Sequence, residues 1–99
     1  MTIYVDQLIS YGQQAKAGAD RYFGSGKQSC HMTCDGNLEE LHVFAEGIGL
    51  RRSWFQRGSM PHYDLTPNKR VTAIRAGAQE TTTIEAIRAW RASQQQIIS

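Results

Sequence analysis

The segment SCHMTCD, residues 29–35, alternates apolar and polar side chains and predicts a half-buried β-strand around which the rest of the chain is arranged. Side chains of a strand point alternately to its two faces. The apolar set shares one face: Cys30, Met32 and Cys34. The polar set shares the other: His31, Thr33 and Asp35. The first face therefore belongs in a core, and the second is available for chemistry.

Two further strands are predicted on either side of this one. Residues 2–6, TIYVD, alternate and are rich in β-forming residues. Residues 78–82, AQETT, allow a third short strand. Between the first two strands, residues 10–29 are rich in glycine and poor in apolar side chains, which predicts a flexible loop.

Three helices are predicted from their capping residues. The first spans 37–48, capped by Asn37 and ended by Gly49. The second spans 67–76, with a cap at Thr66 and a stop at Gly77. The third spans 83–93 after Thr82, is expected to bury Ile84, Ile87 and Trp90, and leaves a fraying tail at 94–99.

This order of elements favours a small α/β fold, in which residues 1–99 form a single domain of about three short strands, partly parallel, packed with three helices. The segment 51–65 between the first two helices is expected to be irregular. The expected core consists of Cys34, Leu41, Phe44, Ile48, Ile74 and Ile87.

Composition limits the possible functions. No apolar run approaches the roughly 18 residues of a membrane span. The start, MTIYVDQL, lacks the basic segment of a secretory signal, so we expect a cytoplasmic protein. Cys30 and Cys34 fit neither a CxxC nor a zinc spacing and are expected to be reduced core thiols.

Positive charge is concentrated in the middle of the chain. Residues 51–70 carry five cations and only one acid, whereas the remainder is mildly acidic. Such an asymmetry fits an anionic partner or simply a solvated surface. No nucleic-acid-binding motif is present and the pI is only about 8.7, so a nucleic-acid partner is not expected.

Three histidines and two aspartates are suited to acid–base catalysis or to binding a divalent metal. The predicted catalytic groups are His31, His62 and Asp64, and the predicted ligand contacts include Asp35, His42 and Tyr63. We expect Asp35 and the HYD motif of residues 62–64 to meet beyond the carboxyl ends of strands. Asp35 could instead cap a turn, and His42 could make a single hydrogen bond at a helix edge. No metal-binding motif is present, so no metal centre is predicted, and the cofactor stays unknown.

Lys69 and Arg70 fall in the first turn of the second helix, where positive charge is unfavourable. A bound phosphate or carboxylate would reverse that effect. An ion pair between Asp64 and Arg70 explains the same residues without a ligand.

The RRSWFQR segment, residues 51–57, places two aromatic residues among arginines. Such a surface can stack on a nucleotide or contact another protein. Adjacent aromatic side chains usually point apart, so one of Trp54 and Phe55 is expected in the core.

The segments YVD, CHMTCD, EELHVFAEGIGLRRSWFQ, HYDLTPNKR and AGAQE, in this order, resemble the domain-of-unknown-function family 4031, short bacterial and phage proteins. The resemblance covers residues 2 to about 80 and implies no established activity. From the residues themselves we expect a pocket that binds an anionic small molecule of the phosphate or nucleotide type, with hydrolysis as the reaction that fits best. The alternative is a non-catalytic accessory protein that binds a host protein through the Trp54/Phe55 loop.

Overall fold

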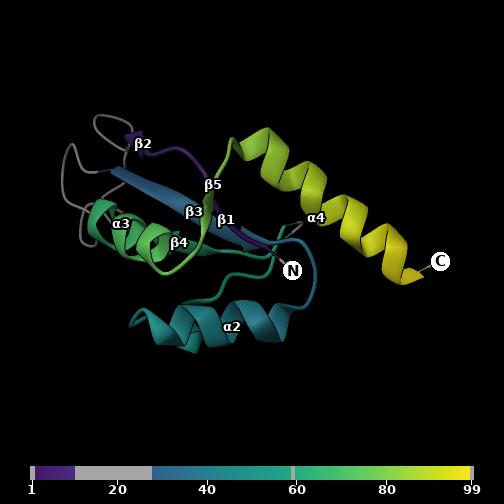
Figure 1. The fold of residues 1–99 in the computed structure, drawn as a ribbon, viewed down its shortest axis with the longest axis horizontal. Helices are drawn as coiled ribbons and strands as arrows, with labels where there is room; N and C mark the ends of the chain where they lie inside the picture. The colour runs from purple at the N-terminus through teal and green to yellow at the C-terminus, as the bar shows by residue number, and fades with distance from the viewer. Residues whose placement is uncertain (1, 11–27, 59, 99) are drawn as a thin grey trace.

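The computed structural model describes residues 2–10, 28–58 and 60–98. Its elements, in chain order, are β1 (Ile3–Val5), β2 (Ile9–Ser10), β3 (Gln28–Cys34), α2 (Leu38–Gly47), the 3-10 turn η1 (Arg52–Trp54), β4 (Tyr63–Leu65), α3 (Pro67–Arg75), β5 (Gln79–Glu80) and α4 (Thr83–Ile98) (Figure 1). The predicted α/β class and the three helices are confirmed. Most of the loop predicted at 10–29 lies outside the described residues.

The strands form one mixed sheet with β3 at its centre. β1 and β4 pair with β3 on opposite edges, both antiparallel, and β5 adds to β1 in parallel. The expected partly parallel sheet is therefore confirmed. Helix α3 connects β4 to β5, two strands that run in the same direction, and so forms the crossover of a β-α-β unit.

A bulge separates β1 from β2, which both pair with β3. Val5 pairs with Met32 and Ile9 pairs with Ser29, so residues 6–8 lie opposite only residues 30 and 31. The backbone N–H of Asp6 donates to the carbonyl of His31 at 3.1 Å. Bulges of this kind bend a strand and re-aim a side chain. Here the bulge begins at Asp6.

The apolar face of the sheet packs against α2 and α3, while α4 lies on the other side of the sheet from α2 (Figure 1). Buried side chains in this core include Cys34, Leu41 and Ile48, as predicted. Phe44 and Ile74 are half-buried against them.

The burial predicted for α4 is partly wrong. Ile84 is 63% exposed, and the buried position is Ala86. Trp90, one turn further along the same stripe, packs against the core. Trp90 was expected to be buried and packs as predicted, whereas Ala86 is buried in place of Ile84 and Ile87 is only half-buried. The helix also continues to Ile98, beyond the predicted end at residue 93.

The capping predictions are confirmed. Asn37 accepts from the N–H of Glu39 at 2.8 Å, and Thr66 accepts from that of Lys69 at 3.2 Å. Gly49 has a φ of 91°, a backbone conformation that favours glycine after a helix. Within the described residues, none of the helices is long and apolar enough to cross a membrane.

The HYD motif, residues 62–64, differs in its secondary structure from the expectation. Its segment was expected to be irregular, yet residues 63–65 form strand β4. Three residues are too few for an alternating pattern to be recognised in the sequence. The strand is stabilised by pairing with β3, which no local pattern reveals.

Candidate functional site: a His–His–Asp cluster on the polar face of the sheet

Three neighbouring strands place their polar side chains in a row. His31 of β3 lies directly opposite Asp64 of β4 and next to Asp6 at the end of β1. Directly opposed residues of paired strands point to the same face of a sheet. His62 precedes Asp64 by two residues and so points to that face as well. This face is opposite to the one that Cys30 and Met32 bury in the core.

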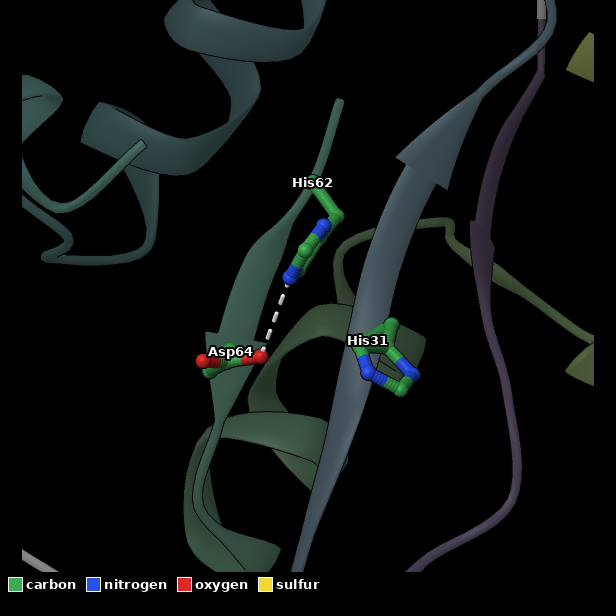
Figure 2. A group of neighbouring side chains, drawn as sticks. All are labelled: His31, His62 and Asp64. Carbon is green, nitrogen blue, oxygen red and sulfur yellow. Dashed lines mark ion pairs between the residues drawn. The ribbon is translucent and has the colours of Figure 1, made fainter. Parts of the chain in front are cut away.

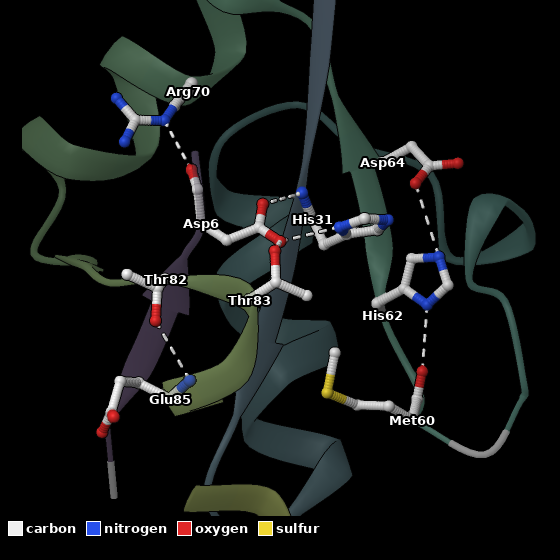
Figure 3. Close-up of polar contacts among 9 residues, drawn as sticks. All are labelled: Asp6, His31, Met60, His62, Asp64, Arg70, Thr82, Thr83 and Glu85. Carbon is white, nitrogen blue, oxygen red and sulfur yellow. Dashed lines mark hydrogen bonds and ion pairs between the residues drawn. The ribbon is translucent and has the colours of Figure 1, made fainter. Parts of the chain in front are cut away.

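Asp6 holds His31 in one orientation. Its Oδ2 lies 2.8 Å from Nδ1 of His31 and accepts a hydrogen bond from Oγ1 of Thr83 at 2.7 Å (Figure 3). Its Oδ1 accepts from the backbone N–H of His31 at 2.6 Å. The residue is 1% exposed, so these contacts take the place of water. Thr83 comes from the first turn of α4, and α4 therefore helps to fix the pair.

The protonation of this pair follows from the contacts. Burial raises the pKa of Asp6, but the hydrogen bonds from His31 and Thr83 outweigh it and leave the pKa below its usual value. The hydrogen bond to Asp6 raises the pKa of His31, against a smaller opposing effect of burial. Asp6 is therefore an ionised acceptor, and Nδ1 of His31 carries a proton.

His62 is held in a similar way. Its Nδ1 lies 3.0 Å from the carbonyl oxygen of Met60, and its Nε2 lies 3.4 Å from Oδ1 of Asp64. Asp64 also accepts a hydrogen bond from the side-chain amide of Gln56. The contact with Asp64 raises the pKa of His62. Burial raises the pKa of Asp64, but the contacts with His62 and Gln56 have the larger effect. The pKa of Asp64 therefore lies below its usual value.

His31, His62 and Asp64 form what we call the His–His–Asp cluster (Figure 2). One nitrogen of each ring and one carboxylate oxygen all lie within 4.8 Å of one another. The rings meet edge to face, with centroids 4.9 Å apart. All three side chains are half-buried. The structure thus brings the three predicted catalytic residues together, although their chemical roles stay a prediction.

Asp35 does not join the cluster, and the expectation that it meets the HYD motif is wrong. Its carboxylate accepts from the N–H of Thr2 at 2.7 Å and from the hydroxyl of Tyr4 at 3.3 Å. The register of β3 and β4 places His31 opposite Asp64, so Asp35 comes four residues further along the chain, and its carboxylate turns to β1. Asp35 therefore ties down the start of β1.

His42 and Tyr63 lie on the core side of the sheet. Nδ1 of His42 is 2.7 Å from the hydroxyl of Tyr63, which is fully buried. Phe55 packs edge to face on His42, with ring centroids 4.5 Å apart. Tyr63 points away from its neighbours His62 and Asp64 because side chains alternate along β4. The sheet therefore separates both residues from the cluster.

The two cations of the first turn of α3 have partners within the chain. Nζ of Lys69 donates to the carbonyl oxygen of Ile48, at the end of α2. Nε of Arg70 donates to the backbone carbonyl of Asp6 at 2.9 Å, and its terminal nitrogen pairs with Glu80 at 3.2 Å. The alternative to an anion site, an ion pair of Arg70 with Asp64, is wrong in its partner, because Arg70 pairs with Glu80.

Trp54 and Phe55 point apart, as expected. Phe55 packs against the core, whereas Trp54 is 51% exposed with the guanidinium of Arg51 lying 5.8 Å from its ring. Arg52 turns back to form ion pairs with Glu39 and Glu46 of α2.

Sequence reasoning missed Asp6 and Thr83, the two residues that orient His31. An acid as the last residue of a predicted strand was one available signal, because ligand sites collect at the carboxyl ends of strands. Thr83 gave no such signal. It lies beside Thr82, which caps α4 by accepting from the N–H of Glu85 at 3.2 Å, and its bond to Asp6 spans most of the chain (Figure 3).

Comparison with known proteins gives one match. A family model described as "Protein of unknown function (DUF4031)" matches residues 18–93. This range holds the whole His–His–Asp cluster and most of α4, whereas β1 and Asp6 precede it. The chain matches neither a curated protein nor a solved structure.

Proposed function

The chain belongs to the DUF4031 family, whose description assigns no function, and from the geometry of the His–His–Asp cluster we propose that it binds an anionic small molecule of the phosphate or nucleotide type and can hydrolyse it. The observation that carries this proposal is the pair formed by Asp6 and His31. A buried carboxylate at Nδ1 fixes the tautomer of the imidazole and leaves Nε2 free to exchange a proton.

The cluster offers two imidazoles for one reaction. His31 takes a proton from a water molecule through Nε2, and the water oxygen attacks the phosphorus or carbonyl centre of the bound ester. The bond to the leaving group breaks, and protonated His62 gives its proton to the leaving oxygen. Both imidazoles then exchange protons with solvent, so the net reaction adds one water across the ester bond.

The anion contact in this proposal is Nε2–H of protonated His62, because Nδ1 of each histidine faces a partner within the chain. Lys69 and Arg70 were the anion contacts expected from the sequence, but their nitrogens donate to Ile48, Asp6 and Glu80. Arg70 reaches the site indirectly, because it holds the backbone at Asp6.

The test is a thermal-shift and calorimetric screen with inorganic phosphate and nucleoside mono-, di- and triphosphates. A ligand at a hundredfold excess over its dissociation constant stabilises the native state by about 2.7 kcal/mol. We expect this gain in the wild type, its loss in His62→Asn, and its retention in His42→Gln, since His42 lies across the sheet. Absence of any gain, or equal loss in both variants, would refute anion binding at the cluster. Phosphate release from the ligand that binds then tests hydrolysis.

A second candidate function is favoured by the exposure of Trp54. An aromatic ring that is 51% exposed beside an arginine is a typical centre of a protein interface. In this case the chain is a non-catalytic accessory protein. Capture of a partner that Trp54→Ala abolishes and His62→Asn leaves intact would support it, and capture that survives Trp54→Ala would refute it.

A further inference from the structure

The ring nitrogens of the His–His–Asp cluster are arranged as they are around a bound metal. Nδ1 of His62 contacts a backbone carbonyl, and Nδ1 of His31 contacts a carboxylate oxygen of Asp6 that also accepts from Thr83, so both nitrogens face hydrogen-bond acceptors and are N–H donors. In neutral rings both Nε2 atoms then carry lone pairs. Figure 3 shows the second ring nitrogen of His31 pointing away from Asp6 and toward His62. Carbonyl or carboxylate contacts at the outer nitrogen are what metal-bound histidines almost always have.

A second feature concerns the gap between His62 and Asp64. Nε2 of His62 lies 3.4 Å from Oδ1 of Asp64. Ligand bonds of about 2.1 Å around a tetrahedral ion place two ligand atoms about 3.4 Å apart. The observed separation equals that spacing.

The third ligand needs only a small movement. One ring nitrogen of each histidine and one oxygen of Asp64 lie within 4.8 Å of one another, so each of these distances has to shorten by at most about 1.4 Å to reach the tetrahedral spacing. Among the described residues, this is the one group of three such side chains close enough to hold an ion.

We propose that His31, His62 and Asp64 bind one divalent transition-metal ion, with zinc as the reference ion. Two imidazoles and one carboxylate suit Zn²⁺ and similar ions, whereas Mg²⁺ prefers oxygen ligands. Three protein ligands leave a fourth position open to water or to an anion. Asp6 is a positioning residue, because it contacts His31 through Nδ1 and does not reach the metal.

This inference deepens the proposed function, although metal binding itself does not depend on it. Asp6 and Asp64 bring two negative charges to the site, which oppose an incoming phosphate. A divalent ion would neutralise them and coordinate the anion directly. With the ion bound, Nε2 of His31 is a ligand, so the metal takes over from His31 the activation of water.

The experiment uses tag-free protein dialysed against EDTA and then against metal-free buffer. Co²⁺ titration followed by visible absorption reports coordination geometry, and calorimetry with Zn²⁺ gives stoichiometry and affinity. We expect one equivalent of Zn²⁺, a tetrahedral Co²⁺ spectrum, and no comparable binding of Mg²⁺.

Variants locate the site. His62→Asn and Asp64→Asn should weaken Zn²⁺ binding by more than about a hundredfold, and Asp6→Asn by about 10- to 100-fold. The matched controls His42→Gln and Asp35→Asn, which change the same residue types outside the cluster, should retain wild-type affinity. Circular dichroism without metal confirms that each variant is folded.

The inference is overturned if the wild type shows no saturable Zn²⁺ binding, or if the controls lose as much affinity as the cluster variants. Phosphate titrations with EDTA and with Zn²⁺ separate it from the proposed function. Zn²⁺ binding without any response to phosphate would support the metal site and refute the anion-binding function. Phosphate binding by EDTA-treated protein that takes up no Zn²⁺ would support the anion-binding function and refute the metal site.

Discussion

Replacing Asp6 with Asn should destabilise the fold by about 3 kcal/mol. The carboxylate is 1% exposed and contacts three donors, two on His31 and one on Thr83. Hydrogen bonds to a charged group contribute about 1.5–3 kcal/mol each, and those between neutral groups about 0.5–1.5. The substitution keeps the shape but removes the charge, so each of the three contacts loses about 1 kcal/mol.

Urea unfolding in EDTA-containing buffer, followed by tryptophan fluorescence, measures this loss without any contribution from metal. A change of 3 kcal/mol should also lower the melting temperature by about 10–25 °C in a domain of this size. The control is Glu80→Gln, which removes a 63% exposed partner of Arg70 and should cost less than about 0.5 kcal/mol.

The proposed role of Asp6 is refuted if the free energy of unfolding of Asp6→Asn lies within about 1 kcal/mol of that of the wild type. It is also refuted if Glu80→Gln lowers the free energy of unfolding as much as Asp6→Asn does. Either result would mean that the carboxylate of Asp6 is not the charged anchor of His31, and Asp6 would then have no special part in placing the ring.

Three further predictions test other parts of the fold. Gly49→Ala should cost about 1–2 kcal/mol in urea unfolding, because φ is 91° and the added Cβ would lie 2.7 Å from a lysine Nζ; unchanged stability would contradict this. Tyr63→Phe should cost about 1 kcal/mol by unpairing His42, yet leave Zn²⁺ affinity unchanged because both lie across the sheet; a weakened metal affinity would contradict the separation. Cys30 and Cys34 are buried free thiols, so a thiol reagent should label them only after unfolding; rapid labelling of native protein would show that they are accessible.

Local chemistry made much of the site predictable. Alternation in β3 placed His31 on the face opposite the cysteines, and the two-residue spacing placed His62 and Asp64 on one side of their strand. Both expectations depend only on the period of an extended chain, which holds whether or not the strand is recognised. The helix caps were predictable for the same reason, since a cap is a contact between residues close in sequence.

Tertiary pairing decided the rest. Whether Asp35 lies beside the HYD motif depends on the register between β3 and β4, which pairs Asp64 with His31, and no local pattern encodes that register. The bond between Asp6 and Thr83 likewise joins residues that are far apart in sequence. Ile84 was expected in the core because it is large and apolar, but packing selected the stripe through Ala86 instead.

For Lys69 and Arg70 the sequence and the structure predict opposite effects of the same substitution on stability. At the start of a helix both cations face an unfavourable dipole. This suggested an anion there, and it predicts that replacing both cations leaves the stability without anion unchanged or slightly higher. In the structure Lys69 instead contacts the carboxyl end of α2 through Ile48, where the dipole favours a cation. Arg70, whose side chain is 16% exposed, holds the backbone of Asp6.

The double substitution Lys69→Gln and Arg70→Gln should therefore lower stability by about 2–3 kcal/mol, since hydrogen bonds from charged groups are lost at both positions. Melting with and without phosphate measures it. The loss should be the same in both conditions, and any stabilisation by phosphate should persist in the double variant and disappear in His62→Asn. If instead the double variant keeps its stability without phosphate and loses only the response to it, the anion binds at the start of α3 and not at the His–His–Asp cluster.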